Sequence, residues 1–181
     1  MHKDVARVLV SREEIHEKCI ELGQKITKDY TEKGELPILV GLLNGSVPFM
    51  SELMKNIEMD VEIDFMDVSS YEGTHSVGSI RINKDMGTSA AGKSILLVED
   101  IVDTGKTLTE VKRMLANKGA REVRVVSLLD KPERRTEEIE ADYVGFTIPN
   151  EFVIGYGLDY NQKYRNLPYV GILKPEVYEE S

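Results

Sequence analysis

Two acidic residues followed by a short polar turn are the groups in this sequence whose types and spacing best suit chemistry. Glu99 and Asp100 come directly after an apolar run, and after two more residues the chain reads Asp103-Thr104-Gly105-Lys106-Thr107. Neighbouring carboxylates suit a cation or the hydroxyl groups of a sugar. Hydroxyl side chains around a flexible glycine suit the wrapping of a phosphate. A ligand that satisfies both halves carries a phosphate, a polyol and, we expect, Mg²⁺.

An apolar strand and an amphipathic helix are expected to hold these groups. The run at residues 95–98 is apolar without alternation, which is typical of a strand buried on both faces of a parallel sheet. Apolar residues recur at helical spacing from Leu108 to Leu115, and Lys118-Gly119 ends that pattern. The turn therefore lies between the carboxyl end of a strand and the start of a helix, where open α/β sheets bind ligands.

Two simpler interpretations of the turn were weighed. Gly105-Lys106-Thr107 imitates the end of a P-loop, but that motif needs a glycine at position 100, where this chain has aspartate. Alternatively, Glu99 and Asp100 merely end a strand, and Asp103 or Thr104 merely caps a helix. Two carboxylates directly after a buried strand count against this second interpretation, because unpaired charges near a core cost free energy unless something binds them.

Composition restricts the class of protein. The chain has 181 residues, enough for one domain with a substantial core, and Cys19 is its only cysteine. Its net charge of −9 speaks against a general nucleic-acid binder. The sequence shows neither a signal peptide nor eighteen consecutive apolar residues, so we expect a cytoplasmic protein that engages no membrane.

Further apolar runs predict a sheet with several strands. A helix is expected to start at the capping box Ser11-Arg12-Glu13-Glu14 and to end at Lys33-Gly34, with Cys19 on its apolar face. The Glu- and Arg-rich segment at residues 132–142 is predicted to be a solvated surface connection, and the polar stretch at residues 69–78 a hairpin tip or a lid. The other predicted strands cover residues 37–43, 61–66, 80–82, 123–129, 143–148 and 169–173.

The run from residue 95 to residue 107 resembles the phosphoribosyl pyrophosphate (PRPP) signature of the type I phosphoribosyltransferases. Other stretches, in chain order, resemble the bacterial hypoxanthine-guanine phosphoribosyltransferases: Asn44-Gly45-Ser46, Ser69-Ser70-Tyr71, Lys131 at a strand end, and residues 148–166. The resemblance implies an α/β fold with a twisted, mainly parallel, Rossmann-like sheet flanked by helices. It also implies one domain of residues 1–181, with a lid at about residues 69–78 and a small hood built from the N-terminal segment and about residues 150–181.

The resemblance assigns roles residue by residue. Asp103 would be the general base, and Ser69, Ser70 and Tyr71 would belong to the lid. PRPP would be bound by Glu99, Asp100, Asp103, Thr104, Gly105, Lys106 and Thr107, and its pyrophosphate by Asn44, Gly45 and Arg165. The purine would be bound by Lys131, Phe152, Val153 and Asp159, and Mg²⁺ by Glu99, Asp100 and Asp159. Many relatives carry lysine where this chain has Asn44, and the peptide bond before that position can be cis in the family.

The resemblance implies purine salvage: Mg²⁺-dependent conversion of hypoxanthine or guanine and PRPP to IMP or GMP and pyrophosphate. A homodimer or homotetramer that binds small molecules and no nucleic acid is expected. Two alternatives stay open. The chain is instead a PRPP-sensing regulator without catalysis, or a phosphoribosyltransferase that prefers xanthine. Lys131 argues against adenine, because a cation favours a carbonyl oxygen over an amino group.

Overall fold

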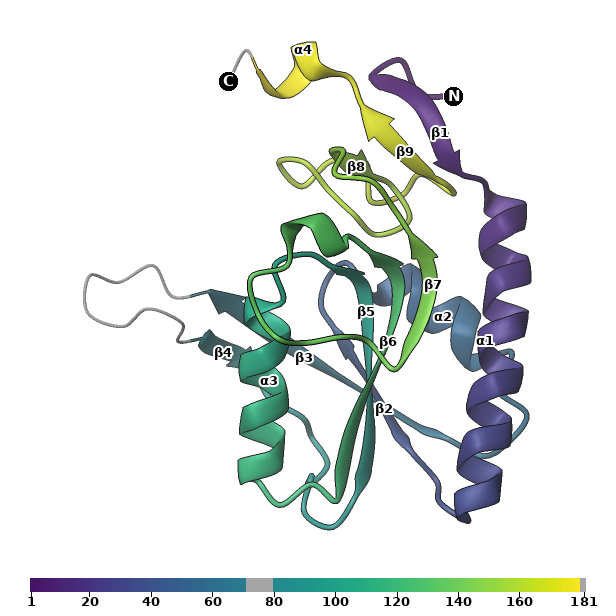
Figure 1. Cartoon of the computed structure of the whole chain (residues 1–181), viewed down its shortest axis with the longest axis vertical. Coiled ribbons are helices and arrows are strands. Elements are labelled where there is room, and N and C mark those ends of the chain that lie inside the picture. The colour runs from purple at the N-terminus through teal and green to yellow at the C-terminus, as the bar shows by residue number, and fades with distance from the viewer. Residues whose placement is uncertain (71–79, 180–181) are drawn as a thin grey trace.

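A twisted sheet forms the centre of the computed structural model, which describes residues 1–70 and 80–179 (Figure 1). In these residues the sheet has the strand order β4-β3-β2-β5-β6-β7. All neighbouring strands are parallel except β3 and β4, which are antiparallel. The strands are β2 (Ile38–Leu42), β3 (Glu62–Ser70), β4 (Ile80–Lys84), β5 (Ser94–Val102), β6 (Glu122–Asp130) and β7 (Tyr143–Thr147).

The register brings the carboxyl ends of the central strands together. Gly41 of β2 lies opposite Val98 of β5, and Val102 at the end of β5 lies opposite Asp130 at the end of β6. Parallel strands in register deliver their following loops to one edge of the sheet. The loops after β2, β5 and β6 therefore meet there, although the chain between them is long.

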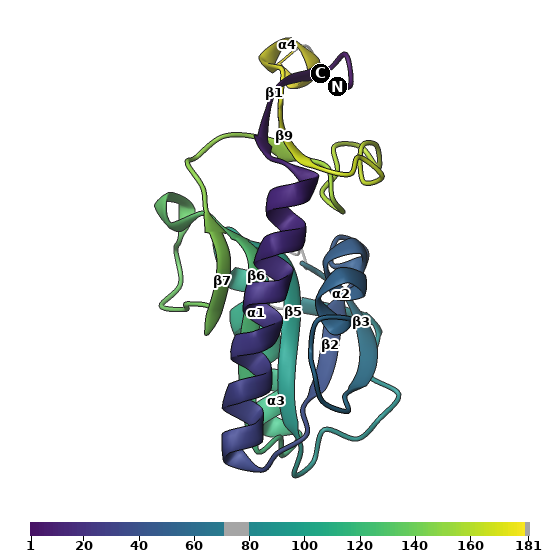
Figure 2. The same ribbon diagram turned by 90° about the vertical axis from the view of Figure 1, so that its right-hand side faces the viewer.

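Helices cover both faces of this sheet (Figures 1 and 2). The helices α1 (Arg12–Lys33) and α2 (Val47–Met54) pack on one face, and α3 (Lys106–Asn117) packs on the other. The predicted capping box of α1 is present, and Gly34 ends the helix in the left-handed conformation. Cys19 is fully buried on α1, and burial raises the pKa of its thiol to about 12, as suits a packed core residue.

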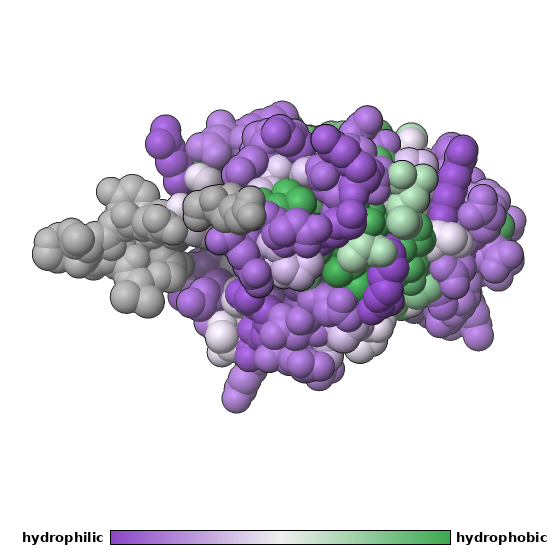
Figure 3. Space-filling view, turned by 90° about the horizontal axis from the view of Figure 1, so that it is seen from above, coloured by the Kyte–Doolittle hydropathy of each residue, from purple (hydrophilic) through white to green (hydrophobic). Residues whose placement is uncertain are grey.

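A second, three-stranded sheet lies beyond the carboxyl edge of the first (Figure 1). It has the order β1 (Val5–Val10), β9 (Val170–Leu173), β8 (Val153–Ile154), and all its pairs are antiparallel. This sheet belongs to the hood, and α4 (Pro175–Tyr178) follows it. Viewed from the hood end, the surface is mainly hydrophilic with a smaller apolar area (Figure 3).

The predicted fold class is confirmed, and the structure adds elements that were not predicted, among them β8 and α4 in the hood. The strand β1 was not predicted from its sequence, and a short 3₁₀ helix, η1 (Pro132–Arg134), opens the segment that follows β6. In residues 61–66, Val61, Ile63 and Phe65 alternate with Glu62, Asp64 and Met66, which predicts a wetter face that includes Met66. This is wrong for Met66, which is fully buried, whereas Ile63 is 46% exposed. Among the described residues, no helix is long and apolar enough to cross a membrane.

Candidate functional site

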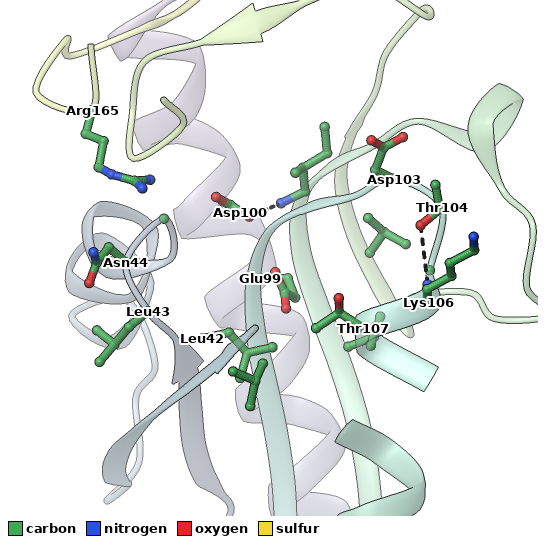
Figure 4. Close-up of a pocket in the computed structure, with 16 residues that line it drawn as sticks. Leu42, Leu43, Asn44, Glu99, Asp100, Asp103, Thr104, Lys106, Thr107 and Arg165 are labelled. Atoms are coloured by element: carbon green, nitrogen blue, oxygen red, sulfur yellow. Dashed lines mark hydrogen bonds between the residues drawn. The ribbon is translucent and has the colours of Figure 1, made fainter. Parts of the chain in front are cut away.

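A pocket of about 310 Å³ opens at the carboxyl edge of the parallel sheet (Figure 4). Three loops that are distant in the sequence line it: the loop after β2, the loop between β5 and α3, and the hood loop that carries Arg165. The lining includes all ten residues predicted to bind PRPP or its pyrophosphate, namely Asn44, Gly45, Glu99, Asp100, Asp103, Thr104, Gly105, Lys106, Thr107 and Arg165. The structure thus gathers the residues predicted to bind PRPP and pyrophosphate around one cavity.

The acidic pair lies at the end of β5, where the buried strand reaches the pocket. Burial raises the pKa of both carboxyl groups, and the charge of Asp100 raises the pKa of Glu99 further. For Asp100 this rise in pKa is partly offset by the backbone N–H of Ile101, which donates to its Oδ1 at 2.7 Å, and by the positive charge of Arg165. The net pKa of both acids stays raised although Arg165 is nearby, and such a pair suits a ligand that carries positive charge or several hydroxyl groups.

The loop from Asp103 to Thr107 turns the chain from β5 into α3. Gly105 immediately precedes α3 and has φ +86°. Because glycine has no side chain, nothing at this position accepts a hydrogen bond from the first turn of the helix. Thr104 Oγ1 accepts only a long hydrogen bond of 3.4 Å from Lys106 N. The positive end of the helix dipole and the two threonine hydroxyl groups therefore face the pocket, an arrangement that suits a phosphate.

Arg135, a residue that the sequence did not single out, binds this loop from the segment that follows β6. Its guanidinium donates to the backbone oxygens of Asp103 at 3.1 Å and Ile139 at 2.6 Å, and it forms an ion pair with Asp130. The Arg135 side chain is only 13% exposed. Residues 132–142 were predicted to be a solvated connection, and this is wrong for Arg135 and Ile139, since both pack against the loop.

Gly105 fits this arrangement because it lacks a side chain. A Cβ atom at this position would lie 2.5 Å from Cγ2 of Ile139 and 3.1 Å from Cδ of Arg135. The backbone oxygen of Thr104 is also tied to the same segment, since Thr136 N donates to it at 3.0 Å. The loop is thus fixed to the chain that follows β6, and its pocket side stays open.

Asp103 pairs with Arg134 of η1. Oδ1 of Asp103 lies 3.0 Å from Nε of Arg134, and the two groups form an ion pair without a hydrogen bond. The Asp103 side chain is 40% exposed and the Arg134 side chain 50% exposed, although Oδ1 of Asp103 itself is buried. Asp103 therefore presents a carboxylate at the pocket while an exposed arginine screens it.

The loop after β2 approaches the acidic pair closely. The peptide bond between Leu43 and Asn44 is cis, in keeping with the resemblance. A Cβ atom on Gly45 would lie 1.8 Å from Oδ2 of Asp100, and one on Gly157 would lie 1.9 Å from the backbone oxygen of Gly45. These two glycines let the β2 loop, the β5 carboxylate and the hood loop come into contact.

Arg165 and Asp159 lie together in the hood loop. Arg165 donates to the backbone oxygen of Gly157 at 2.6 Å and lies 3.3 Å from Oδ1 of Asp159. The other carboxylate oxygen of Asp159 accepts a hydrogen bond of 2.9 Å from Gln162 N. Asp159 does not line the pocket around Asp100, and both of its oxygens already have partners.

The residues predicted to bind the purine lie outside the lining of this pocket. A lysine at a strand end is often solvated, but Lys131, next after the end of β6, is 7% exposed and donates to the backbone oxygen of Glu151 at 2.8 Å. Burial lowers the pKa of Lys131. The next residue after Glu151 is Phe152, which is 37% exposed, and Val153 is buried in β8. The lysine therefore ties the sheet edge to the segment that carries the predicted base-stacking ring.

The predicted lid and metal site are only partly described. Ser69 and Ser70 end β3 and are exposed, whereas Tyr71 and the rest of the predicted lid, residues 71–78, lie outside the described residues. Within residues 1–70 and 80–179, no group of three or more His, Cys, Asp or Glu side chains is placed to hold a metal ion. Glu99 and Asp100 form a pair, and Asp159 lies apart from them.

Comparison with known proteins agrees with this architecture. Residues 11–161 match the phosphoribosyl transferase domain family. The chain is 55% identical over 181 residues to the hypoxanthine-guanine phosphoribosyltransferase of Lactococcus lactis subsp. lactis, and the match covers 99% of this chain and 97% of that protein. The structure of a hypoxanthine phosphoribosyltransferase from Staphylococcus aureus has a TM-score of 0.93 and 52% identity, and the match covers 98% of this chain and 96% of that one.

One relative is much longer than this chain. The bifunctional protein TilS/HprT of Listeria monocytogenes serotype 4b is 52% identical over 181 residues, and this chain spans 28% of its length. The family match extends over most of the chain, and the Lactococcus relative is matched over nearly its whole length. The chain therefore belongs to the phosphoribosyltransferase family, in its group of hypoxanthine-guanine phosphoribosyltransferases.

Proposed function

We propose that the whole chain, residues 1–181, acts as one domain that transfers the phosphoribosyl group of PRPP to a 6-oxopurine, hypoxanthine or guanine. The observation that carries the proposal is the composition of the pocket: an acidic pair, a helix N-terminus with two threonines, and an arginine border one cavity. PRPP contains ribose hydroxyl groups, a 5′-phosphate and a pyrophosphate. Each of these three parts has a chemically matching partner in the pocket.

PRPP is bound through three parts of this pocket. The backbone N–H groups at the start of α3 and the hydroxyl groups of Thr104 and Thr107 hold the 5′-phosphate. Glu99 and Asp100 hold the ribose hydroxyl groups and offset the positive charge that develops on the ring. Backbone groups of Asn44 and Gly45, with the Arg165 guanidinium, hold the pyrophosphate, and the amide of Asn44 contributes no charge there.

Mg²⁺ fits the acidic pair. Carboxylate oxygens are its preferred protein ligands, and Glu99 and Asp100 are adjacent acids that burial makes costly to ionise without a cation. Bound with PRPP, the ion would neutralise charge on the leaving pyrophosphate. A second ion at Asp159 fits less well, because Arg165 and Gln162 already occupy both carboxylate oxygens.

The chemistry exchanges one bond for another at C1 of the ribose. The bond from C1 to the pyrophosphate oxygen breaks with both electrons going to pyrophosphate, and purine N9 forms a bond to C1. Asp103 accepts the proton that the purine loses at N7, as its partly exposed position at the pocket allows. Lys131 donates to the 6-oxo group, Phe152 stacks on the ring, the main chain at Val153 binds the base edge, and Asp159 adds a further contact there.

Pyrophosphate release with PRPP and Mg²⁺ tests the proposal, with hypoxanthine, guanine, xanthine and adenine offered separately. We expect release with hypoxanthine and guanine. The substitution Asp103→Asn should lower kcat by about 10²- to 10⁴-fold while PRPP binding persists. Because it also removes the ion pair with Arg134, Arg134→Met is the matched control, and it should keep most of the activity.

The other outcomes separate the alternatives. Release with xanthine alone would favour the xanthine-preferring enzyme. Binding of PRPP in a titration, without release for any base, would identify a PRPP-sensing regulator. Equal loss of turnover and PRPP binding in Asp103→Asn would show that Asp103 supports the loop and is not the general base.

A further inference from the structure

The Phe152 ring is enclosed by two tyrosines of the hood. Tyr178 stacks on it, with ring centroids 4.8 Å apart and an angle of 20° between the planes. Tyr160 meets it edge to face, with centroids 5.5 Å apart at 89°. A flat ligand that stacks on Phe152 therefore has to use the face that Tyr178 does not cover.

The backbone places Tyr178 there through a short path. Leu173 N donates to the backbone oxygen of Phe152 at 2.9 Å, which anchors the end of β9 beside the ring. Lys174 N then donates to the backbone oxygen of Asp4 at 2.9 Å, and Glu179 N donates to that of Pro175 at 2.9 Å. The single turn of α4 thus returns the chain over Phe152, five residues after the anchor.

Both ends of this unit are fixed in the hood. Tyr178 and Val177 pack against a small core of Val5, Ile154 and Leu173, all three of which are buried. On the other side, the Lys131 ammonium holds the backbone oxygen of Glu151, the residue before Phe152. The position of the Phe152 backbone is set by Lys131 and β9, which leaves the plane of its ring to be set by the two tyrosines.

We infer that Tyr178 is a positioning residue for the purine site: it holds the Phe152 ring in the plane on which the base stacks. The inference rests on the proposed function, since it assumes that Phe152 receives a purine. Stacked aromatic pairs contribute a modest free energy, so loss of the tyrosine ring should raise KM for the base about two- to tenfold. KM for PRPP should not change, because the PRPP pocket does not include Tyr178.

The variants separate a stacking role from simple packing. Tyr178→Phe keeps the flat ring and should keep wild-type kinetics, whereas Tyr178→Leu keeps apolar bulk without a flat face and should behave like Tyr178→Ala. Glu176→Ala, an exposed residue of the same helical turn, is the matched control. The measurements are KM and kcat for hypoxanthine at saturating PRPP, KM for PRPP, and thermal unfolding of each variant.

Each result decides the inference. A raised KM for hypoxanthine in Tyr178→Ala and Tyr178→Leu, rescue by Tyr178→Phe and an unchanged KM for PRPP would support it. An unchanged KM for hypoxanthine in an active Tyr178→Ala would overturn it, and a lowered KM would overturn it by showing that Tyr178 competes with the base. If the wild-type protein releases no pyrophosphate with any base, the proposed function itself fails.

Discussion

Replacement of Arg135 by methionine should destabilise the protein strongly, although the residue lies in a charge-rich connection. Methionine keeps similar bulk but removes the donors to the backbone oxygens of Asp103 and Ile139 and the ion pair with Asp130. Side-chain exposure of this pair is 13% for Arg135 and 18% for Asp130, so water replaces the lost contacts poorly. Breaking a buried ion pair by removing one partner costs about 3–5 kcal/mol.

This cost should produce a measurable decrease in the melting temperature, Tm. For a chain of this size, 1 kcal/mol lowers Tm by about 2–4 °C, so Arg135→Met should lower it by about 6–20 °C. Arg113→Met is the matched control, because Arg113 is 67% exposed and pairs with Glu110 one turn away on α3. Such exposed pairs contribute about 0.5 kcal/mol or less to stability, so Arg113→Met should lower Tm by no more than about 2 °C. Circular dichroism suits the measurement, since the chain contains no tryptophan.

A second measurement connects Arg135 with the pocket. Because Arg135 fixes the backbone of the loop that contains Thr104 and Gly105, Arg135→Met should also raise KM for PRPP when assayed below its melting temperature. Arg135→Lys keeps the charge near Asp130 but loses the planar fork of donors. Its Tm and its KM for PRPP should therefore lie between those of the wild-type protein and Arg135→Met. Equal melting temperatures for Arg135→Met and Arg113→Met would refute the reasoning, as would a destabilised variant with an unchanged KM for PRPP.

The remaining predictions concern the pocket and the base. In ligand-free, Mg²⁺-free protein, Glu99→Gln should raise Tm at neutral pH, because a raised folded-state pKa costs stability where the same group is ionised in the unfolded chain. The gain in Tm should vanish below the ordinary Glu pKa of 4.5, and a gain that persists at lower pH would contradict this. Gly45→Ala should lower kcat/KM for PRPP by about 10²-fold by displacing Asp100, whereas Gly87→Ala, where a Cβ would meet only Asp64 at 3.8 Å, should not. Lys131→Ala should raise KM for hypoxanthine in the release assay more than KM for PRPP, and an equal rise in both would remove Lys131 from the base site.

Local sequence patterns were sufficient to predict the central sheet and the loops at its edge. The apolar runs before Asn44 and before Glu99 do not alternate with polar residues, because helices cover both faces of these strands. This lack of alternation is enough to predict buried strands from the sequence. Parallel strands then bring their following loops to one edge by geometry. This geometry explains why Asn44 and Glu99, which only the resemblance had assigned to one ligand, line the same pocket.

Contacts that depend on individual side chains could not be predicted in this way. Arg135 lies among glutamates and arginines, a composition typical of solvated segments, and only its tertiary contacts show that it is buried. Strand β1 has a pairing partner about 160 residues away, in β9, so neither segment signals the other. Tyr178 gave no periodic signal, because its contact with Phe152 depends on one turn of helix after β9.

The pocket concentrates features that lower the stability of the ligand-free protein, and the rest of the fold compensates for them. Glu99 and Asp100 are neighbouring acids whose ionisation is opposed by burial, and Gly105, just before α3, offers the helix no side-chain cap. Both are unfavourable alone and, under the proposed function, would be relieved by a ligand that supplies a cation at the acids and an anion at the helix. Arg135 holds the loop in this shape before the ligand arrives, so that binding free energy is not spent on ordering it. Ligand-free stability and affinity for PRPP should therefore respond in opposite directions to Glu99→Gln and in the same direction to Arg135→Met.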